Sequence, residues 1–517
     1  MLIIEVVYAG IAITLAVYGL HALSLTILAL RNRSKLAENP ENPAEWPVVT
    51  VQLPIYNERF VVKRLLRAVA GLDYPLQKLQ IQVLDDSDDA TSEIIAEQVS
   101  YFKAQGINIA HIQRPARDGY KSGALAWGLN TAIGEYIAIF DADFVPAPDT
   151  LRRMVPHLCA HPDIGCVQAR WGHINPDSSW LTRAQSAGID GHFVVEQTAR
   201  SSSDLMLNFN GTAGVWRRVC LDDSAGWSSD TLTEDLDLSY RAQLRGWRIR
   251  YLPNVMVPGE LPVTIDAYKR QQFRWAKGSI QTARKMLPRV WRSRLNLKAK
   301  IGATLHLTNY FVHPLIFLNL ILALPISYSQ SPLVKIVPFI AVAGLGTGFM
   351  YWIAMQDDAK NLPQRISHMI ALLILGLGLS LNNTRAVIEA LLGVKSAFLR
   401  TPKYNLQQNA KRVPGNAYML PSDPILWIET VLSLYGLSIA LYLIIGGIWR
   451  IGIWILVYGL GFTYIAGLGY IILLQAYRES KKQSQHTPPI LLSQTIPTPG
   501  EHSLPNEALV QLDDVVV

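Results

Sequence analysis

Cysteine is scarce in this sequence, with three residues among 517, at Cys159, Cys166 and Cys220. None of them stands in a C-x-x-C pair or at a metal-site spacing from a histidine. This scarcity argues against a small disulfide-stabilised scaffold and against a cysteine-based zinc site. We therefore predict that all three thiols are reduced core residues of a cytosolic domain.

Charged residues are also few, and a phosphate-binding loop motif is absent. The sequence contains no G-x-x-x-x-G-K-[ST] motif, which argues against a P-loop ATPase. Charged residues make up 17% of the chain, and the formal net charge of +7 is modest. The basic residues cluster beside apolar segments, as in residues 31–35 and 284–294. Such clusters mark the cytoplasmic flank of a membrane segment more often than a nucleic-acid site, so we expect no nucleic-acid partner.

Long apolar runs, by contrast, are abundant, and half of all residues are hydrophobic. They concentrate at the start of the chain and after Ile301. The run from Val6 to Leu30 is long enough for a bilayer crossing, which needs ~20 residues, and no basic region precedes it as in a signal peptide. Because basic residues follow it, we predict an N-terminal transmembrane helix within residues 1–35, with the following domain in the cytoplasm.

Further apolar segments predict a C-terminal transmembrane region over residues 301–477, at roughly 301–326, 333–355, 366–381, 424–448 and 451–477. A basic loop, residues 395–412, should be cytoplasmic, but it would lie outside if every segment crossed the membrane. The shortest segment, 366–381, is therefore expected to lie along the interface or to dip in without crossing. Residues 478–517 are polar and proline-rich, and we expect them to form a disordered tail.

The middle of the chain shows a different pattern. From residue 48 onward, short apolar runs alternate with polar stretches of helical periodicity. Such alternation predicts a doubly wound α/β sheet, which we assign to a domain over residues 36–264. Residues 265–300 are basic, helical in pattern and rich in aromatic side chains, which is typical of amphipathic helices at a membrane interface.

Two of the predicted strands end in acidic residues. The apolar run 136–140 leads into Asp141 and Asp143, and an earlier strand leads into Asp85 and Asp86. Open α/β sheets bind their ligands at the carboxyl ends of strands. On an extended backbone residues i and i+2 point the same way, so Asp141 and Asp143 can converge on one hard cation that also takes phosphate oxygens. The alternative is a solvated turn, which so short a motif does not exclude by itself.

Four motifs follow one another along the chain: Asp85-Asp86, Asp141-Ala142-Asp143, Thr233-Glu234-Asp235 and Gln271-Gln272-Phe273-Arg274-Trp275. This series resembles the D, DxD, TED and QxxRW motifs of the processive, membrane-embedded family 2 glycosyltransferases. Within that family the greatest likeness is to the plant cellulose-synthase-like A group, which makes mannan and glucomannan backbones, in the segments RDGYKSGAL, AIFDADFVPAPD, VQARWGHIN, FNGTAGVWR, TEDLDLSYRAQLRGW and RQQFRW. The resemblance implies a cytosolic, Rossmann-like GT-A domain inserted between α-helical transmembrane segments.

A loop near the end of the chain adds to the resemblance. The segment SAFLRTPKY, residues 396–404, resembles the gating loop of the family, with Phe398, Thr401 and Lys403 at the matching places. We assign the gating-loop-like segment to residues 395–423. Nothing after the last apolar segment resembles the cyclic-di-GMP-binding domain of bacterial cellulose synthase, which argues against regulation of that type.

The resemblance also implies residues that bind a nucleotide sugar. Asp141 and Asp143 would hold Mg²⁺ or Mn²⁺, a Lewis acid for the departing diphosphate. The predicted donor-binding residues are Tyr56, Glu58, Asp85, Asp86, Lys121 and Asp141. Within this set Asp85 and Asp86 would contact the base or the ribose, and Lys121 the phosphates. Taken alone, Lys121 would be interpreted as a solvated residue at the start of a helix.

Asp235 is the predicted catalytic base, and Glu234 lies beside it in the same motif. An acceptor hydroxyl is a poor nucleophile and needs a base within hydrogen-bond reach, which contributes about 10²–10⁴-fold. With one base and no second nucleophile, the expected reaction is a single inverting displacement. The alternative role for Thr233 and the two acids is capping of a helix N-terminus, and the two roles are compatible.

The acceptor-binding residues are predicted to be Phe209, Gly211, Thr212, Gln271, Arg274 and Trp275. Arg274 can pair with a diphosphate in a bidentate way, and Trp275 offers a flat face to the terminal sugar. The alternative is an ordinary interfacial Arg/Trp pair, which is common near membranes. His192 is interpreted as a structural histidine rather than as a ligand.

These residues together predict a membrane-embedded, inverting glycosyltransferase that transfers a hexose from UDP-glucose or GDP-mannose to a growing β-linked polysaccharide. Its expected partners are the nucleotide sugar, the polysaccharide acceptor and membrane lipids, and its expected location is the plasma membrane. One alternative is a glycolipid synthase that adds a single sugar to a diacylglycerol or a sphingoid lipid. The other is a non-catalytic membrane scaffold, against which the intact acidic motifs argue.

Overall fold

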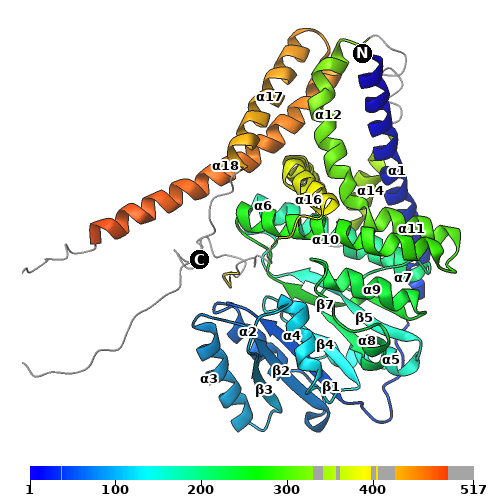
Figure 1. Ribbon diagram of the computed structural model, residues 1–517, viewed down its shortest axis with the longest axis vertical. Helices are drawn as coiled ribbons and strands as arrows, with labels where there is room; N and C mark the ends of the chain where they lie inside the picture. The colour runs from blue at the N-terminus through cyan, green and yellow to red at the C-terminus, as the bar shows by residue number, and fades with distance from the viewer. Residues whose placement is uncertain (37, 330–341, 357–360, 397–402, 406–424, 487–517) are drawn as a thin grey trace, which may run out of the picture.

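The computed structural model describes residues 1–486 except 37, 330–341, 357–360, 397–402 and 406–424. An α/β domain lies at one end of the molecule, and several long helices extend from one side of it (Figure 1). A layer of further helices separates the two parts (Figure 1). This arrangement agrees with the predicted insertion of an α/β domain between apolar helical segments.

The α/β domain is built on a seven-stranded mixed sheet of order β3-β2-β1-β4-β6-β5-β7. Strands β1 to β4 pair in parallel, as predicted for a doubly wound sheet. Strand β6 is antiparallel to both β4 and β5, and β5 pairs in parallel with β7. The strands are β1 Val49–Ile55, β2 Leu79–Asp85, β3 Ile109–Gln113, β4 Tyr136–Ile139, β5 Ile164–His173, β6 Gly214–Arg217 and β7 Arg248–Gly259.

Strand β4 is apolar throughout because both of its faces are buried. Ala138 packs in a core with helices α2, α3 and α5, whereas Ile137 and Ile139 pack in a second core with α4, α8 and α9. A strand covered by helices on both sides needs apolar residues at every position rather than at alternate ones. These helices are α2 Val62–Ala70, α3 Thr91–Ala104, α4 Tyr120–Leu129, α5 Thr150–Ala160, α8 Arg218–Asp223 and α9 Glu234–Leu244.

Two expectations about this domain are wrong. Strand β4 ends at Ile139, so Asp141 and Asp143 lie in a turn and not on an extended strand. The Phe144 N–H donates to the Asp141 carbonyl at 3.0 Å, which closes this turn. Cys159 is exposed because it lies in the last turn of α5, whereas the other two cysteines are buried as expected.

Four segments of the described chain are long and apolar enough to cross a membrane: Leu2–Leu36, Asn309–Ser327, Leu426–Ile445 and Trp449–Arg478. They contain α1 (Leu2–Asn32), α12 (Val312–Ser327), α17 (Leu426–Ile445) and most of α18 (Trp449–His486), and they lie mostly above the sheet in Figure 1, with α18 running obliquely. The predicted segment 333–355 lies partly outside the described residues. Its described part contains a short helix, α14 (Leu345–Ala354), which packs against α1.

The first part of the predicted disordered tail, residues 478–486, is helical. Helix α18 continues to His486, and its sequence contains no proline. The polar residues that follow the membrane-facing part of α18 therefore extend the same helix. Residues 487–517, the rest of the predicted tail, lie outside the described residues.

An interface layer lies between the sheet and the apolar helices, and it comprises α6 Trp180–Asp190, α10 Ile265–Arg292, α11 Leu297–Leu307 and α16 Ser380–Leu392 (Figure 1). Helix α15 (Leu362–Gly378) meets α16 at a bend of 46°. Helix α16 then runs along α10, since Asn382 Nδ2 donates to the Lys269 carbonyl at 3.0 Å and Lys277 pairs with Glu389 at 2.7 Å. The chain thus returns to the interface layer after α15, and the prediction that 366–381 does not cross stays a prediction.

A buried ion pair fastens α17 to the interface layer. Lys269 Nζ on α10 lies 2.7 Å from Glu429 Oε1 on α17, and the two side chains are 4% and 1% exposed. An ionised group removed from water costs several kcal/mol unless an opposite charge accompanies it. The pair therefore fixes where α17 sits relative to α10, the helix that carries the predicted acceptor-binding residues.

Glu429→Ala is expected to destabilise the protein strongly, by on the order of 3–5 kcal/mol, because it leaves the Lys269 ammonium buried without its counter-charge. The double variant Lys269→Met with Glu429→Leu should recover most of this loss, since an apolar pair of similar volume replaces the two charges. Thermal unfolding of the purified protein in detergent measures both effects. A double variant no more stable than Glu429→Ala would contradict this account.

Candidate active site

The predicted site residues gather in one cleft at the carboxyl ends of β1 and β4. Strand ends, the N-terminus of α9 and one face of α10 all contribute to its walls. The predicted residues that line the cleft are Tyr56, Glu58, Asp86, Lys121, Asp141, Asp143, Gly211, Glu234, Asp235, Gln271, Arg274 and Trp275. The structure therefore brings together residues that are more than 200 positions apart in the sequence.

Asp141 and Asp143 each face a lysine ammonium. Lys121 Nζ lies 2.6 Å from Asp141 Oδ1, and Lys403 Nζ lies 2.6 Å from Asp143 Oδ2. Burial raises the pKa of the Asp141 carboxyl, the charge of Asp143 raises it further, and Lys121 opposes both. Two clustered carboxylates that require cations beside them have the charge and the oxygen atoms that a divalent ion binds.

The metal hypothesis can be tested against the donor atoms present. The described residues contain no group of three or more His, Cys, Asp or Glu side chains placed to hold one ion. Asp141 and Asp143 are thus the two protein carboxylates at this point, and phosphate oxygens can complete the coordination of a hard cation. The residues fit an ion bound together with a nucleotide diphosphate, and they do not form a closed all-protein metal site.

Asp85 and Asp86 have different surroundings. The Asp85 side chain is buried away from the cleft, where Ser92 Oγ donates to its Oδ2 at 2.5 Å and His111 Nε2 lies 2.8 Å from the same oxygen. Burial alone would raise the pKa of this carboxyl, but the hydrogen bonds lower it to about 2. Only Asp86 lines the cleft, where Arg114 binds it with two nitrogens. Asp86 therefore faces the cleft, whereas Asp85 has a structural position behind its wall.

Two predicted acceptor residues lie behind the cleft wall. Phe209 is fully buried, with its ring centroid 5.6 Å from that of Trp216. Thr212 is also fully buried, and its Oγ1 accepts the backbone N–H of Asp141 at 2.8 Å. The expectation that these side chains line the acceptor path is therefore wrong for both. They hold the wall in place, because apolar packing and a backbone hydrogen bond require a position inside it.

Gly211 is located where the cleft wall approaches two charged side chains. Its φ of +83° lies in the left-handed region, which favours glycine. A Cβ atom here would lie 3.0 Å from Asp235 Oδ2 and 3.4 Å from Lys121 Nζ. The Gly211 carbonyl accepts a hydrogen bond from the same Lys121 Nζ at 2.9 Å. A side chain at this position would therefore crowd both the Asp235 carboxylate and the Lys121 ammonium.

Asp235 lies in the first turn of α9. Thr233 occupies the N-cap position, but its side chain makes no capping hydrogen bond, so the predicted cap by this residue is wrong. Asp235 Oδ1 accepts the N–H of Leu236 at 2.8 Å. Burial raises the pKa of Asp235 to about 7, with Glu234 adding to the shift and Lys121 opposing it. A carboxylate with a pKa near neutrality is suited to general-base catalysis.

Helix α10 presents Gln271, Arg274 and Trp275 to the cleft, and their spacing of three and four residues places them on one face. Arg274 lies among the acidic residues of the cleft. Its burial lowers the pKa of the guanidinium, while the charges of Glu234, Asp141, Asp235 and Asp143 raise it. An arginine in this field supplies permanent positive charge next to the carboxylates.

Lys403 enters the cleft from the predicted gating-loop-like segment. Besides its contact with Asp143, its ammonium donates to the carbonyl of Glu260 at the end of β7. Residues 403–405 are therefore on the same side of the molecule as the α/β domain. The other two positions that match the gating loop, Phe398 and Thr401, lie outside the described residues.

Sequence reasoning missed several residues that line the cleft: Arg117, His173, Asn210 and Glu260. The Arg117 guanidinium stacks on the Tyr56 ring, 3.3 Å from its centroid, and both residues line the cleft. Arg117 and Asn210 belong to segments quoted above, RDGYKSGAL and FNGT, and could have been found there. His173 belongs to the quoted segment VQARWGHIN and could have been found in the same way, whereas Glu260 carries no comparable signal, because only the pairing of β5 with β7 brings it to the cleft.

Comparison with known proteins identifies relatives along most of the chain. Residues 47–278 match the family model described as Glycosyltransferase like family 2. The chain is 35% identical over 446 residues to glucomannan 4-beta-mannosyltransferase 2 of Arabidopsis thaliana, covering 83% of this chain and 82% of that protein. It is 34% identical over 446 residues to glucomannan 4-beta-mannosyltransferase 1 of Oryza sativa subsp. japonica, covering 84% and 85% respectively.

Among solved structures, the chain is similar to a mannosyltransferase from Pyrobaculum calidifontis in complex with GDP-Man and Mn²⁺. The TM-score is 0.53 at 21% sequence identity, and the match covers 75% of this chain and all of the other. This likeness supports the GT-A-like fold predicted for the α/β domain. The identity to the two plant enzymes over more than four-fifths of their length, together with the cleft that holds all four motifs, shows that this chain is a glycosyltransferase of family 2.

Proposed function

We propose that this membrane-embedded enzyme transfers mannose from GDP-mannose to a growing β-linked mannan or glucomannan chain, with its α/β domain in the cytoplasm. The observation that carries the proposal is the meeting of Asp141, Asp143, Asp235 and Arg274 in one cleft of a chain whose relatives are glucomannan 4-beta-mannosyltransferases. A scaffold protein would have no need to hold so many like charges together. Basic residues that follow α1 support the cytoplasmic placement of the α/β domain.

The donor end of the cleft would bind the nucleotide diphosphate. Asp141 and Asp143 would hold Mg²⁺ or Mn²⁺, and the solved mannosyltransferase of similar fold was determined with Mn²⁺. The ion, when bound, supplies Lewis-acid stabilisation to the departing diphosphate. Lys121 and Arg274 add positive charge at the same end of the cleft, where negative charge grows as the sugar leaves.

Asp235 would accept the proton of the acceptor hydroxyl as that oxygen attacks the anomeric carbon. Its carboxylate lines the cleft and lies close to Gly211, whose carbonyl holds Lys121. A single displacement of this kind inverts the anomeric centre, so an α-linked donor gives a β-linkage. Gln271 and Trp275 on α10 would hold the terminal sugar of the acceptor, with the Trp275 ring as a flat apolar face.

Purified enzyme is expected to release GDP from GDP-mannose in the presence of Mg²⁺ or Mn²⁺ and to form a polymer. Excess EDTA and Asp141→Asn should each abolish transfer, because both remove the cation from the diphosphate. Parallel reactions with UDP-glucose, followed by sizing of the labelled product, separate the donors. Full activity in excess EDTA would contradict the metal assignment, and a single sugar on a lipid would favour the glycolipid synthase.

The kcat/KM of the enzyme is expected to fall with decreasing pH around neutrality, and not around pH 4 where an ordinary carboxyl titrates. The reason is that Asp235 must be ionised to accept a proton, and its pKa is raised to about 7. Asp235→Asn should retain donor binding but lose about two to four orders of magnitude in turnover. Rates measured across pH, with donor affinity measured separately, test both statements. Near-normal turnover of Asp235→Asn would rule out its role as the base.

Gly211→Ala is expected to lower turnover by up to about a hundredfold, because its Cβ would displace the Asp235 carboxylate and the Lys121 ammonium. Gly106→Ala is a matched control, since Gly106 has the same φ of +83° and nothing within 4 Å of its Cβ position. Both variants should lose about 1 kcal/mol of stability from the left-handed backbone. Equal turnover in the two variants would show that the close approach has no catalytic importance.

A further inference from the structure

A π-helical turn, Gly191–Gln197, lies between α6 and the short helix α7 (Thr198–Ser202). π-helical turns are rare, and they occur frequently at functional sites. In an α-helix, two residues five positions apart point about 140° away from each other. The i→i+5 hydrogen bonds of a π-helix instead place such residues one above the other. His192 and Gln197 are five positions apart, so the turn brings them to one face.

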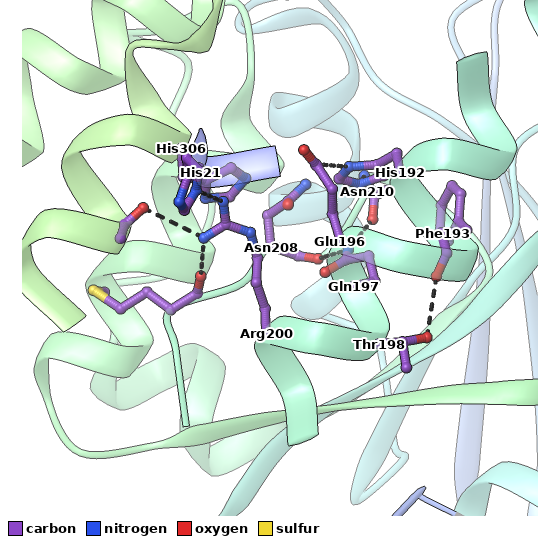
Figure 2. A network of polar contacts seen from close by, with 12 residues as sticks. His21, His192, Phe193, Glu196, Gln197, Thr198, Arg200, Asn208, Asn210 and His306 are labelled. Carbon is purple, nitrogen blue, oxygen red and sulfur yellow. Dashed lines mark hydrogen bonds and ion pairs between the residues drawn. The ribbon is translucent and has the colours of Figure 1, made fainter. Parts of the chain in front are cut away.

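Both side chains contact Asn210, a residue of the cleft wall (Figure 2). Gln197 Nε2 donates to Asn210 Oδ1 at 2.6 Å and to the Asn208 carbonyl at 2.8 Å. On the other side, Asn210 Nδ2 lies 3.0 Å from His192 Nε2. The Asn210 amide is thus clamped at both of its ends by the π-helical turn.

The orientation of this amide follows from donor and acceptor chemistry. A backbone carbonyl can only accept, so Gln197 must direct its nitrogen toward Asn208 and Asn210. Asn210 therefore presents oxygen to Gln197 and nitrogen to His192. The His192 Nε2 atom must then accept, and its Nδ1–H donates to Glu196 Oε2 at 2.9 Å. The Asn208 carbonyl in this way determines the direction of each hydrogen bond from Gln197 through Asn210 and His192 to Glu196.

The π-helical turn is held in place by contacts with helices α11 and α1, which Arg200 makes. Arg200 on α7 is fully buried and lies near Glu196, whose charge it helps to balance. Arg200 donates to the Gly302 carbonyl of α11 at 3.4 Å and lies 3.3 Å from His21 Nε2 of α1 (Figure 2). The turn is therefore fixed between the interface layer and an apolar helix, which makes it a rigid support.

Among the described residues, the Asn210 amide keeps one N–H without a hydrogen-bond acceptor, since His192 takes one of its two hydrogens and the oxygen faces Gln197. The same residue lines the cleft and precedes Gly211, whose carbonyl holds Lys121. A fixed N–H donor in the wall next to the base is suited to an oxygen of the acceptor sugar. If the amide turned over, the cleft would instead face a carbonyl oxygen, which can only accept.

We propose that His192 and Gln197 are positioning residues of the acceptor end, which the π-helical turn brings together to hold the Asn210 amide with its N–H available to an acceptor sugar hydroxyl. This inference rests on the proposed transfer to a sugar acceptor. It assigns the π-helical turn a purpose that an α-helical turn could not serve, because an α-helix would direct one of the two side chains away from Asn210.

Gln197→Glu tests the clamp. A carboxylate would place oxygen against two acceptors, the Asn208 carbonyl and Asn210 Oδ1, so the Asn210 amide should turn over. We expect the KM for a β-1,4-linked manno-oligosaccharide acceptor to rise about tenfold, the scale of one lost hydrogen bond, while the KM for GDP-mannose stays within about twofold. A variant that raises the donor KM and leaves the acceptor KM unchanged would overturn the proposal.

Gln243→Glu is the matched control. Gln243 holds the same loop three residues before Asn210, where its Nε2 donates to the Leu207 carbonyl at 2.7 Å and its Oε1 accepts the Leu207 N–H at 3.1 Å. The same change of amide to carboxylate there should destabilise the loop without turning the Asn210 amide. Its acceptor KM should stay near the wild-type value. An equal rise in both variants would show a general loosening of the loop and would overturn the proposal.

Asn210→Asp provides a second route if Gln197→Glu does not fold. This variant keeps the shape and the hydrogen bond from Gln197 but has no N–H for the acceptor. It should raise the acceptor KM to a similar extent, and an unchanged value would overturn the proposal. Failure of the proposed function is distinguishable, because the wild-type enzyme would then transfer no mannose to the oligosaccharide at all.

Discussion

The crowding of negative charge in one cleft is the constraint on which the rest of the active site depends. Asp141, Asp143, Glu234 and Asp235 all lie within electrostatic range of Arg274. Carboxylates this close disfavour each other's ionised form, and burial increases the cost. The cleft therefore needs cations from several directions, which α4, α10 and residues 403–405 supply. The same excess of carboxylate charge makes the cleft suited to a divalent ion with a diphosphate.

The interface layer connects this cleft to the apolar helices. Helix α10 carries the residues proposed to bind the acceptor on one face and is fastened to α17 through Lys269 and Glu429. On the other side of the cleft, the π-helical turn joins Asn210 to α1 through Arg200 and His21. Polar groups in these positions are costly to bury unless they are paired. Their pairing therefore sets the position of the acceptor end relative to the membrane-facing helices.

Several parts of the site were predictable because they depend on local sequence. The four motifs and Lys121 were found from residue types at fixed spacing, and the structure places members of all of them in one cleft. Asp85, Phe209 and Thr212 were assigned wrongly, since neighbours in a motif can face opposite sides of a wall. Whether a side chain points into a cleft or into a core depends on packing partners that are distant in the sequence.

The sequence by itself determined the division into apolar segments and an α/β domain, because hydrophobic periodicity and strand-helix alternation are local properties. It also determined the family, because the four motifs and their order can be recognised without any knowledge of the fold. Only the tertiary structure decided that Asp141 and Asp143 lie in a turn, that Lys403 reaches Asp143, and that His192 and Gln197 share a face. These features depend on where strands end, how distant segments meet, and which helical pitch the packing imposes, and none of them is encoded in a short stretch of chain.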